Sequence, residues 1–445
     1  MKLFAYILLY LEVMIHRLIF EGSILMMNKK KAIVVGAGIG GLTTALYLHR
    51  AGLDVRIYES VTTIKELGVG INLLPHSVRI LWDLGLQKAL DEVAIRTKQL
   101  VYYNKFGQLI WQEARGIDAG YSWPQYSIHR GRLQGILLNE VQRVLGEDCI
   151  NTGKYLSHVE QQNNQVQAYF VDRNNEQQHH VVEADVLIGA DGIHSAMRKQ
   201  LYPYDDKLKY GGRILWRGMT KAQPFLSGRT MIMAGNIDEK FVAYPITEPD
   251  DMGLCDINWI AELVVKEPPD RNDWNRVANR EDFSGKFQAW TFDWLDISSL
   301  IAGAESVYEF PLVDRDPLPQ WSFGRVTLLG DAAHPMYPIG SNGASQAILD
   351  AEALYLALKE NQDFEHALLM YEQQRLEKTA SIVHSNRQYG PEIVMQMVHE
   401  RAPDGFTRLD DVISQAELEE VANRYKQIAG FDKQQLNHLE MKVIK

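Results

Sequence analysis

The sequence predicts an α/β protein in which a parallel sheet with helices comes first, a mostly antiparallel sheet follows, and the C-terminal region is helical. Three observations support this class. Residues 32–59 follow the order strand, glycine-rich turn, helix, strand. Residues 204–310 contain successive strand-like runs rich in aromatic side chains, and the pattern beyond Asp350 is helical. Alternating strands and helices are typical of parallel sheets, whereas successive strands favour antiparallel pairing.

The composition is that of an ordinary globular protein. The 445 residues are 46% hydrophobic and 23% charged, and they can form roughly two or three domains. The formal net charge of −11 argues against a nucleic acid as partner. The two cysteines, Cys149 and Cys255, exclude a disulfide framework and a cysteine-rich zinc site. We therefore expect no metal and a reducing, cytoplasmic location.

The first residues form an apolar stretch that leaves several interpretations open. Residues 3–20 are long enough to just cross a bilayer, but a glutamate, a histidine and an arginine interrupt them. The stretch is a membrane anchor, an ordinary docking helix, or the product of a mis-assigned start, with Met26 or Met27 as the true beginning. A possible membrane contact through residues 3–20 therefore remains an expectation.

A glycine-rich turn follows the first strand and has the spacing of a dinucleotide-binding motif. The turn reads Gly36-Ala37-Gly38-Ile39-Gly40-Gly41, and a helix, a second strand and Glu59 come after it. In this Rossmann-like arrangement the first glycine makes the tight turn, the second admits a pyrophosphate and the last lets helix pack on strand. The acidic residue is placed to bind a ribose. FAD and NAD use the same device, so the motif alone does not choose between them.

A second motif lies in residues 325–350. A short apolar strand ends at Gly330-Asp331, and Gly340-Ser341-Asn342-Gly343 opens a helix. A carboxylate at the carboxyl end of a strand can accept hydrogen bonds from a sugar, and a helix N-terminus stabilises negative charge. Both features suit the ribityl chain and the reduced ring of a flavin. The alternative is an ordinary turn with an N-capping aspartate.

Two further positions could each contact a ligand or have only a structural or solvent-exposed role. Asp191-Gly192 follows another apolar strand and precedes a helix, so the aspartate either faces a ligand or caps the helix. Arg130 stands near a helix start, where a cation is unfavourable for the helix itself. It therefore either reaches a phosphate or lies in solvent.

The substrate side and the catalytic residues are less clearly marked. Trp216, Tyr244 and Met336 are candidates for an apolar aromatic pocket, with core packing as the competing interpretation. No general base stands out. The candidates for a catalytic role are His334, Tyr337 and Arg217.

Three motifs follow one another along the chain: the glycine-rich turn at residues 36–41, Asp191-Gly192, and Gly330-Asp331 with its following loop. Their order resembles that of the class A FAD-dependent monooxygenases, which share the fold of para-hydroxybenzoate hydroxylase. The likeness covers most of residues 31–387. The segments YSIHRGRLQ, ILWRGMT, VDRDPLPQW and NGASQAILD are most similar to phenazine-modifying hydroxylases, followed by salicylate-hydroxylase-like enzymes. One departure is that many members have Gly-Gln-Gly where this chain has Gly340-Ser341-Asn342-Gly343.

The resemblance implies a non-covalent FAD, reduced by a transient NAD(P)H, that reacts with O2 through a C4a-hydroperoxide to hydroxylate a planar aromatic. The substrate would be phenazine-like or hydroxybenzoate-like. The alternatives are a flavin-dependent reductase of an isoprenoid-like substrate and a non-catalytic FAD-binding protein. The resemblance assigns cofactor contacts to Gly36, Gly38, Gly40, Gly41, Glu59, Arg130, Asp191, Gly192, Gly330, Asp331, Pro338, Gly340, Ser341, Asn342, Gly343 and Ala344.

The domain organisation follows from the same likeness and from the change in residue pattern. Residues 1–29 form an N-terminal extension. Residues 30–99, 127–203 and 312–385 form a discontinuous FAD-binding domain, residues 100–126 and 204–311 a substrate domain, and residues 386–445 a helical region. We expect a monomer or a homodimer.

Overall fold

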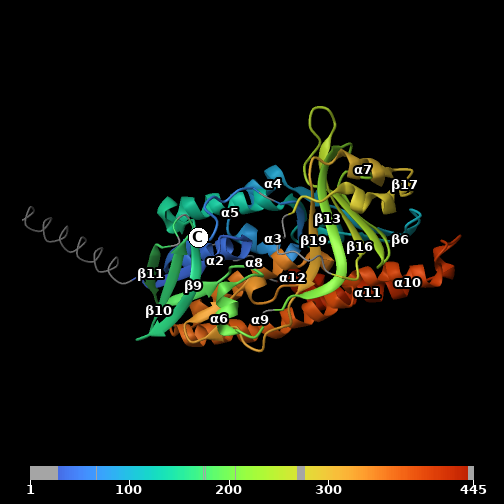
Figure 1. Ribbon diagram of the computed structural model, residues 1–445. Coiled ribbons are helices and arrows are strands. Elements are labelled where there is room, and N and C mark those ends of the chain that lie inside the picture. The colour runs from blue at the N-terminus through green and yellow to red at the C-terminus, as the bar shows by residue number, and fades with distance from the viewer. Residues whose placement is uncertain are drawn as a thin grey trace, which may run out of the picture.

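The computed structural model describes residues 29–438 except 67, 174, 176, 206 and 268–275. The apolar stretch of residues 3–20, with its suggested membrane contact, lies outside the described residues. Within the described part, no helix combines the length and the apolar character needed to cross a membrane. In the view of Figure 1, a row of C-terminal helices runs along the lower side of the molecule.

The first sheet carries the dinucleotide motif. Its strands, in spatial order, are β20 (Ser322–Phe323), β21 (Val326–Leu328), β12 (Val186–Gly189), β1 (Lys31–Val35), β2 (Asp54–Tyr58) and β8 (Ile150–Asn151). Neighbouring strands are parallel except for β20 and β21. Val35, Gly189 and Leu328 stand side by side in register. The turns that follow β1, β12 and β21 therefore meet at one edge of the sheet.

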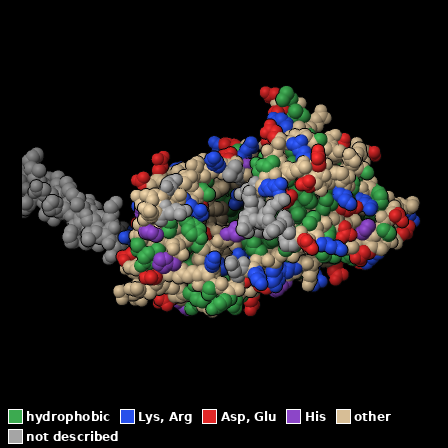
Figure 2. Space-filling model, in the orientation of Figure 1, with side chains coloured by type: hydrophobic (Ala, Val, Ile, Leu, Met, Phe, Trp, Pro, Cys, Tyr) green, Lys and Arg blue, Asp and Glu red, His purple; other side chains and the backbone are tan. Residues whose placement is uncertain are grey.

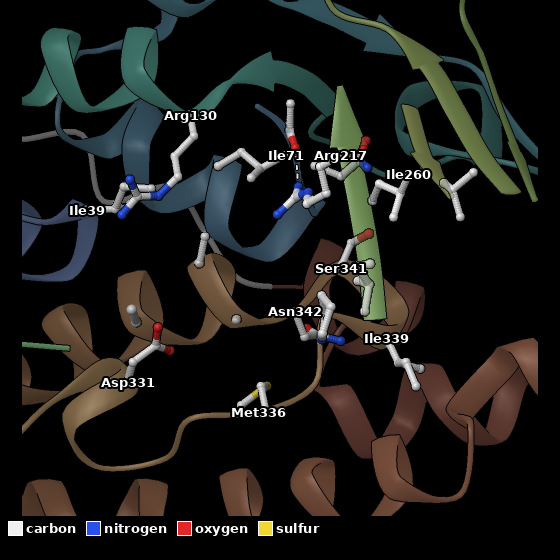
Figure 3. Close-up of a pocket in the computed structure, with 18 of the residues that line it drawn as sticks. Ile39, Ile71, Arg130, Arg217, Ile260, Asp331, Met336, Ile339, Ser341 and Asn342 are labelled. Atoms are coloured by element: carbon white, nitrogen blue, oxygen red, sulfur yellow. Dashed lines mark hydrogen bonds between the residues drawn. The ribbon is translucent and has the colours of Figure 1, made fainter. Parts of the chain in front are cut away.

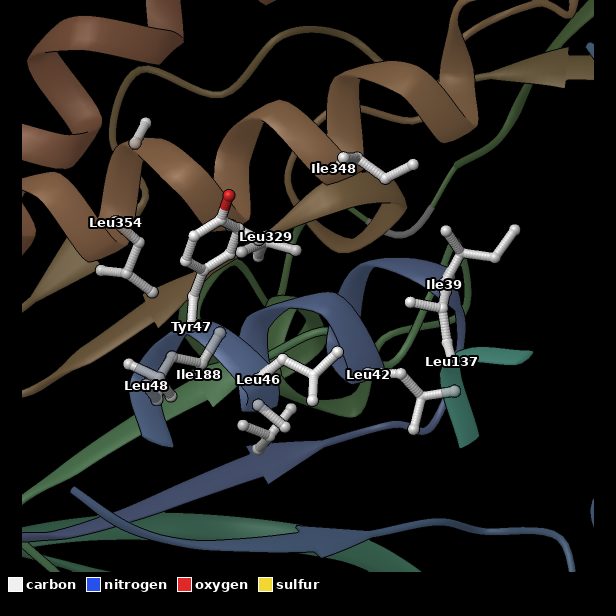
Figure 4. Packing of buried hydrophobic residues seen from close by; sticks show 14 of the residues in the cluster. Ile39, Leu42, Leu46, Tyr47, Leu48, Leu137, Ile188, Leu329, Ile348 and Leu354 are labelled. Carbon is white, nitrogen blue, oxygen red and sulfur yellow. The ribbon is translucent and has the colours of Figure 1, made fainter. Parts of the chain in front are cut away.

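Helix α2 (Ile39–Arg50) is buried along most of its length because it packs between the sheet and two other helices. These are α5 (Arg130–Leu145) and α8 (Gly343–Glu360). Leu42, Leu46 and Tyr47 of α2 join Ile188 and Ile348 in one apolar cluster (Figure 4). This packing fixes the glycine-rich turn before α2 against the turn that opens α8.

The second sheet has seven strands. In spatial order they are β19 (Val307–Asp314), β13 (Lys209–Ala222), β16 (Cys255–Val264), β15 (Glu239–Pro245), β14 (Thr230–Gly235), β5 (Gln99–Tyr103) and β6 (Leu109–Ala114). All pairs are antiparallel except β14 with β5. One face packs on aromatic side chains, with Phe241 and Phe283 near Trp259, and on α7 (Ile297–Gly303). The other face packs partly on apolar residues of the C-terminal region, such as Val394, Val398 and Leu418, and partly lines a cavity.

Smaller elements complete the chain. Two three-stranded sheets have the orders β11 (His179–Ala184), β10 (Gln165–Asp172), β9 (Lys154–Gln162), and β3 (Gly70–Leu73), β7 (Gln125–His129), β4 (Ile95–Thr97). The other α-helices are α3 (Pro75–Asp83), α4 (Gln87–Val93), α6 (Ala196–Leu201), α9 (Phe364–Arg387), α10 (Ile393–Arg401), α11 (Gln415–Ala429) and α12 (Lys433–Asn437). The predicted fold class is confirmed, whereas the domain boundaries stay a prediction.

Candidate flavin and substrate site

Two adjoining cavities open where the edge of the first sheet meets the second sheet. The inner cavity has a volume of about 360 Å³ and the outer one of about 650 Å³. They form one groove because they share the lining residues Gly38, Arg130, Ala190, Gly192 and Arg217. Figure 2 shows a hollow near the middle of one face of the molecule. The carboxyl edge of parallel strands is where α/β folds bind their ligands.

The glycine-rich turn after β1 forms one end of the outer cavity. Gly36 has a φ of +102°, and a Cβ there would lie 2.4 Å from the carbonyl oxygen of Ala190. A Cβ at Gly41 would lie 2.1 Å from the carbonyl oxygen of Gly36, so this glycine allows α2 to pack closely on β1. The Glu59 carboxylate accepts a hydrogen bond from the Ala37 amide at 2.7 Å. The acid expected to bind a ribose is thus held against the turn and lines the cavity.

Arg130 lies where the two cavities join. It is the first residue of α5, and its side chain projects towards Ile39 (Figure 3). Its guanidinium makes no hydrogen bond or ion pair within the described chain. A cation so placed is available to the phosphates of a dinucleotide that runs from the outer cavity into the inner one.

Asp191 combines the two roles that the sequence leaves open. One carboxylate oxygen accepts hydrogen bonds from the amides of Ala196 and Met197, at 2.8 and 3.3 Å, in the first turn of α6, whose N-cap is Ser195. The other oxygen is buried and has no partner among the described residues. Burial raises the pKa of Asp191 above its ordinary value, although these hydrogen bonds oppose the shift. The residue also lines the outer cavity, so its carboxylate both binds the first amides of α6 and faces the ligand space.

The motif after β21 borders the inner cavity. Asp331 lies in the short helix η5 (Gly330–Ala332) and faces the cavity, as Figure 3 shows. The residue is exposed to the open cavity, but the protein around it disfavours the charged form and so raises the pKa of the Asp331 carboxyl. Pro338, Ser341, Asn342, Gly343 and Ala344 line the same cavity at the start of α8.

The loop before α8 has an unusual backbone that the C-terminal helix α11 supports. Gly340 and Ser341 have φ values of +67° and +58°. Gly340 packs on Tyr425 of α11, and a Cβ there would lie 2.1 Å from the Tyr425 hydroxyl. The Asn342 amide donates to that hydroxyl at 2.9 Å and accepts from Gln346 at 3.2 Å. The asparagine that departs from the family pattern is therefore bonded into the protein interior.

The inner cavity reaches the face of the second sheet opposite α7, and Arg217 of β13 lines it there. It donates to the Gly70 carbonyl at 2.9 Å and lies 5.8 Å from the centre of the Phe310 ring. No acidic partner appears among the described residues, and Nε has no hydrogen bond. Burial lowers the pKa of Arg217 below its ordinary value. Tyr244 donates to the same carbonyl at 2.8 Å, and its burial raises its pKa to about 12.

A cluster of charges lines the same cavity and was not anticipated from the sequence. Lys240 lies 2.8 Å from Glu262 and 2.5 Å from Glu392, measured between Nζ and the nearest carboxylate oxygens. Lys240 and Glu262 are direct partners on β15 and β16, whereas Glu392 comes from the turn η7 (Gly390–Glu392). No motif marks these residues, and their separation along the chain hides the contact.

Some sequence candidates do not reach the inner cavity. Trp216 points to the opposite face of β13, where it stacks on Phe283 at 4.9 Å, because side chains alternate along a strand. This corrects its assignment to the substrate pocket; Tyr244 and Met336 do line the cavity. His334 binds Asp350 in the protein interior at 2.6 Å. Tyr337 lines a different cavity, so neither residue is placed to act on a ligand in the inner cavity.

The groove fits an FAD. Its outer part has the glycine turn and Glu59, a cation stands at the junction, and its inner part has Asp331 and a helix N-terminus. The sequence profile described as an FAD binding domain matches residues 29–209 and 313–386. The chain belongs to this family of FAD-binding proteins.

Relatives of known activity narrow the class. The chain is 42% identical over 360 residues to the phenazine 1,6-dicarboxylic acid hydroxylase of Lysobacter antibioticus, with 80% of this chain and 88% of that protein covered. It is 32% identical over 404 residues to a 3-amino-4-hydroxybenzoate 2-monooxygenase of Streptomyces platensis, with 86% and 95% covered. The protein is an FAD-dependent monooxygenase that uses NAD(P)H and O2 to hydroxylate an aromatic substrate.

The fold has solved counterparts. The structure of Klebsiella pneumoniae HpxO complexed with FAD and uric acid superimposes with a TM-score of 0.67. It covers 93% of this chain and 96% of that one at 21% identity. At this identity the likeness concerns the fold.

Proposed function

We propose that the substrate is a planar aromatic acid, held in the inner cavity between the flavin ring and the second sheet. The observation that carries this proposal is Arg217, a partly exposed guanidinium that lines the cavity with no acidic partner among the described residues. A charge that is partly withdrawn from bulk water is costly unless an opposite charge approaches it. The surrounding walls are largely apolar, with Ile71, Met231 and Ile260, and suit a flat ring. The two relatives are named for substrates that are aromatic acids, and this supports the same substrate class.

The proposed roles of the cofactor residues follow from their positions. Gly36, Gly38 and Glu59 would hold the adenosine half of FAD, and Arg130 would contact its pyrophosphate. Asp331 would bind the ribityl chain. The start of α8, residues 340–344, would place its N–H groups at the ring. When bound, the flavin supplies hydride acceptance and oxygen activation, while the protein orients the substrate and keeps water out.

A substrate panel and one variant test the proposal. The purified protein should be yellow, and phenazine carboxylates, salicylates and hydroxybenzoates should be compared for stimulated NAD(P)H consumption and oxygenated product. Arg217→Met should weaken binding of the best acid about 10- to 100-fold, because a charged hydrogen bond contributes roughly 1.5–3 kcal/mol. The FAD content should stay unchanged. Equal affinity in both proteins would reject Arg217 as the acid-binding residue.

Oxygen dependence separates the proposed activity from the reductase alternative, because a reductase forms its product without O2. NAD(P)H oxidation that no aromatic compound stimulates would instead favour a non-catalytic role. We also propose a cytoplasmic location, which the two buried, unpaired cysteines support. The state of association, monomer or homodimer, stays a prediction.

A further inference from the structure

The charged cluster around Lys240 lies in the substrate cavity, beyond the position proposed for the acid group. Lys240, Glu262 and Glu392 are 6%, 4% and 6% exposed, and all three line the inner cavity. Arg213 approaches Glu262 at 3.4 Å, so the cluster holds two cations and two anions. Burial opposes the charge of Lys240, but the two carboxylates raise the pKa of Lys240 above its ordinary value. The lysine is therefore protonated, and the cluster contains as many basic as acidic side chains.

The strand register places the cluster and Arg217 at opposite corners of the cavity wall. Arg217 is the direct partner of Ile260, and Glu262 is the direct partner of Lys240 one strand further on. Lys240 thus lies two strands from Arg217, about 10 Å across the sheet, and two residues along it, about 7 Å. Apolar Ile260 lies between them, and Figure 3 shows it near Arg217. The wall is apolar in the middle and polar at two ends.

The hydrogen-bonding capacity of the cluster defines what it can bind. An ammonium group has three donors, and Lys240 uses two of them for Glu262 and Glu392. Within the described part of the chain the third has no acceptor. A second anion would meet two carboxylates here, whereas a hydroxyl group can accept from the lysine and donate to a glutamate. A neutral donor–acceptor group therefore fits the cluster best.

We propose that Lys240, Glu262 and Glu392 form a hydroxyl-recognition site, so that the preferred substrate is a hydroxylated aromatic acid with the two groups at opposite ends. The inference rests on the proposed function, because it takes Arg217 as the site of the acid group. Lys240, Glu262 and Glu392 would determine the preference for a hydroxylated substrate, because they would contact its hydroxyl group directly.

Matched ligands test the proposal. 6-Hydroxy-2-naphthoate and 2-naphthoate have the same acid group and skeleton, and their dissociation constants can be measured by calorimetry on the flavin-loaded protein. The unaltered protein should bind the hydroxylated acid at least about 10-fold more tightly, since hydrogen bonds to charged groups are the strong ones. A ratio near one would overturn the proposal.

Variants of the charged cluster test whether it causes the preference for the hydroxylated acid. Glu392→Gln and Lys240→Met should each reduce the ratio of the two dissociation constants to below about 3, while binding of 2-naphthoate changes little. Glu248→Gln, an exposed glutamate paired with Arg229, is the matched control and should keep the ratio. Thermal unfolding and FAD content identify a variant that fails to fold; Glu392→Gln retains the size and shape of the side chain. An unchanged ratio in a folded Glu392→Gln protein would overturn the proposal.

The same measurements separate this inference from the proposed function. If Arg217→Met weakens both acids equally while the hydroxyl preference persists, both proposals are supported. If Arg217→Met leaves both affinities unchanged, the acid site is rejected, and the ratio in the cluster variants still decides the hydroxyl site.

Discussion

At the scale of single residues, the most informative side chains are charges that the protein leaves without a protein partner. Arg130 and Arg217 both border the groove, and neither has a carboxylate partner among the described residues. Arg130 is exposed and Arg217 is partly exposed at the groove, whereas the buried Arg375 is paired with Asp350. Because a cation in a cavity is stabilised by an opposite charge, such residues indicate where a ligand of opposite charge belongs.

Asp331 is the acidic counterpart, and its role in holding FAD can be tested by removing its charge. Asp331→Asn keeps the size of the side chain but weakens its hydrogen bonds to a ribityl chain. We expect the dissociation constant of FAD to increase about tenfold or more, since a charged hydrogen bond contributes roughly 1.5–3 kcal/mol. Titration of the apoprotein with FAD measures this. Asp404→Asn in an exposed turn is the control, and unchanged FAD affinity in Asp331→Asn would reject the assignment.

Site residues at the ends of apolar strands can be predicted from the sequence, whereas residues that meet only through distant contacts cannot. Gly36, Asp191 and Asp331 each end an apolar strand, and parallel strands bring such positions to one edge. The aromatic character of Trp216 predicts a place in the substrate pocket. In the structure its neighbour Arg217 faces the inner cavity, and Trp216 points to the opposite face of the strand. Glu392 contacts Lys240 from 152 positions away, and no local pattern predicts that contact.

At the scale of elements, helix α11 supports the loop that opens α8. Leu418, Ala422, Tyr425 and Ala429 form its buried face, spaced as on one side of a helix. The Tyr425 hydroxyl donates to the carbonyl of Ile339 at 3.2 Å and accepts from Asn342. Helix α11 thus holds the loop proposed to face the flavin.

Gly340 tests this support, because the loop can adopt its path only without a side chain there. Gly340→Ala introduces a methyl group at a φ of +67° and within 2.1 Å of the Tyr425 hydroxyl. We expect the free energy of unfolding of the apoprotein to fall by roughly 2 kcal/mol, the usual cost of such backbone strain. Urea unfolding measures it.

Gly343→Ala is the matched control, because a Cβ at Gly343 has no heavy atom within 4 Å and its φ is unremarkable. Its stability should equal or slightly exceed that of the unaltered protein, since alanine favours the helix. If both variants were equally stable, the contact between Gly340 and Tyr425 would not constrain the loop.

The helices and strands could largely be predicted from the sequence, whereas the packing of these elements against one another could not. The strand-like runs in residues 204–310 predict successive strands, and β13, β14, β15 and β16 lie there. The C-terminal region is helical as expected. That Glu392 reaches the groove and Tyr425 supports the loop beside it depends on how the helices dock, and docking is determined by packing between distant segments.

At the scale of the whole molecule, a buried polar network ties the flavin motif to two long helices. Asp350 of α8 accepts hydrogen bonds from the Gly330 amide at 3.0 Å, from His334 at 2.6 Å and from Arg375 of α9 at 2.7 Å. Asp350 is fully buried, so its charge depends on these partners. The network joins the turn after β21, α8 and α9 into one unit, and it explains why His334 is structural.

The network predicts how stability depends on pH. Burial alone would raise the pKa of Asp350, but His334 and Arg375 lower it to about 2. A carboxyl whose pKa is lower in the folded than in the unfolded protein stabilises the fold above its unfolded pKa, and this contribution is lost as the pH falls towards the folded pKa. The shift corresponds to roughly 2 kcal/mol at neutral pH, lost between about pH 4 and pH 2.

Asp350→Asn removes this contribution, so the difference in unfolding free energy between the two proteins should itself depend on pH. Urea unfolding of both apoproteins at pH 6 and pH 3 should show a difference about 1 kcal/mol smaller at pH 3, where Asp350 in the unfolded chain is mostly protonated. The sign follows because only the unaltered protein loses the ionised carboxylate. A difference that stays constant from pH 6 to pH 3 would mean that Asp350 has an ordinary pKa, and that the turn, α8 and α9 are held together by packing alone.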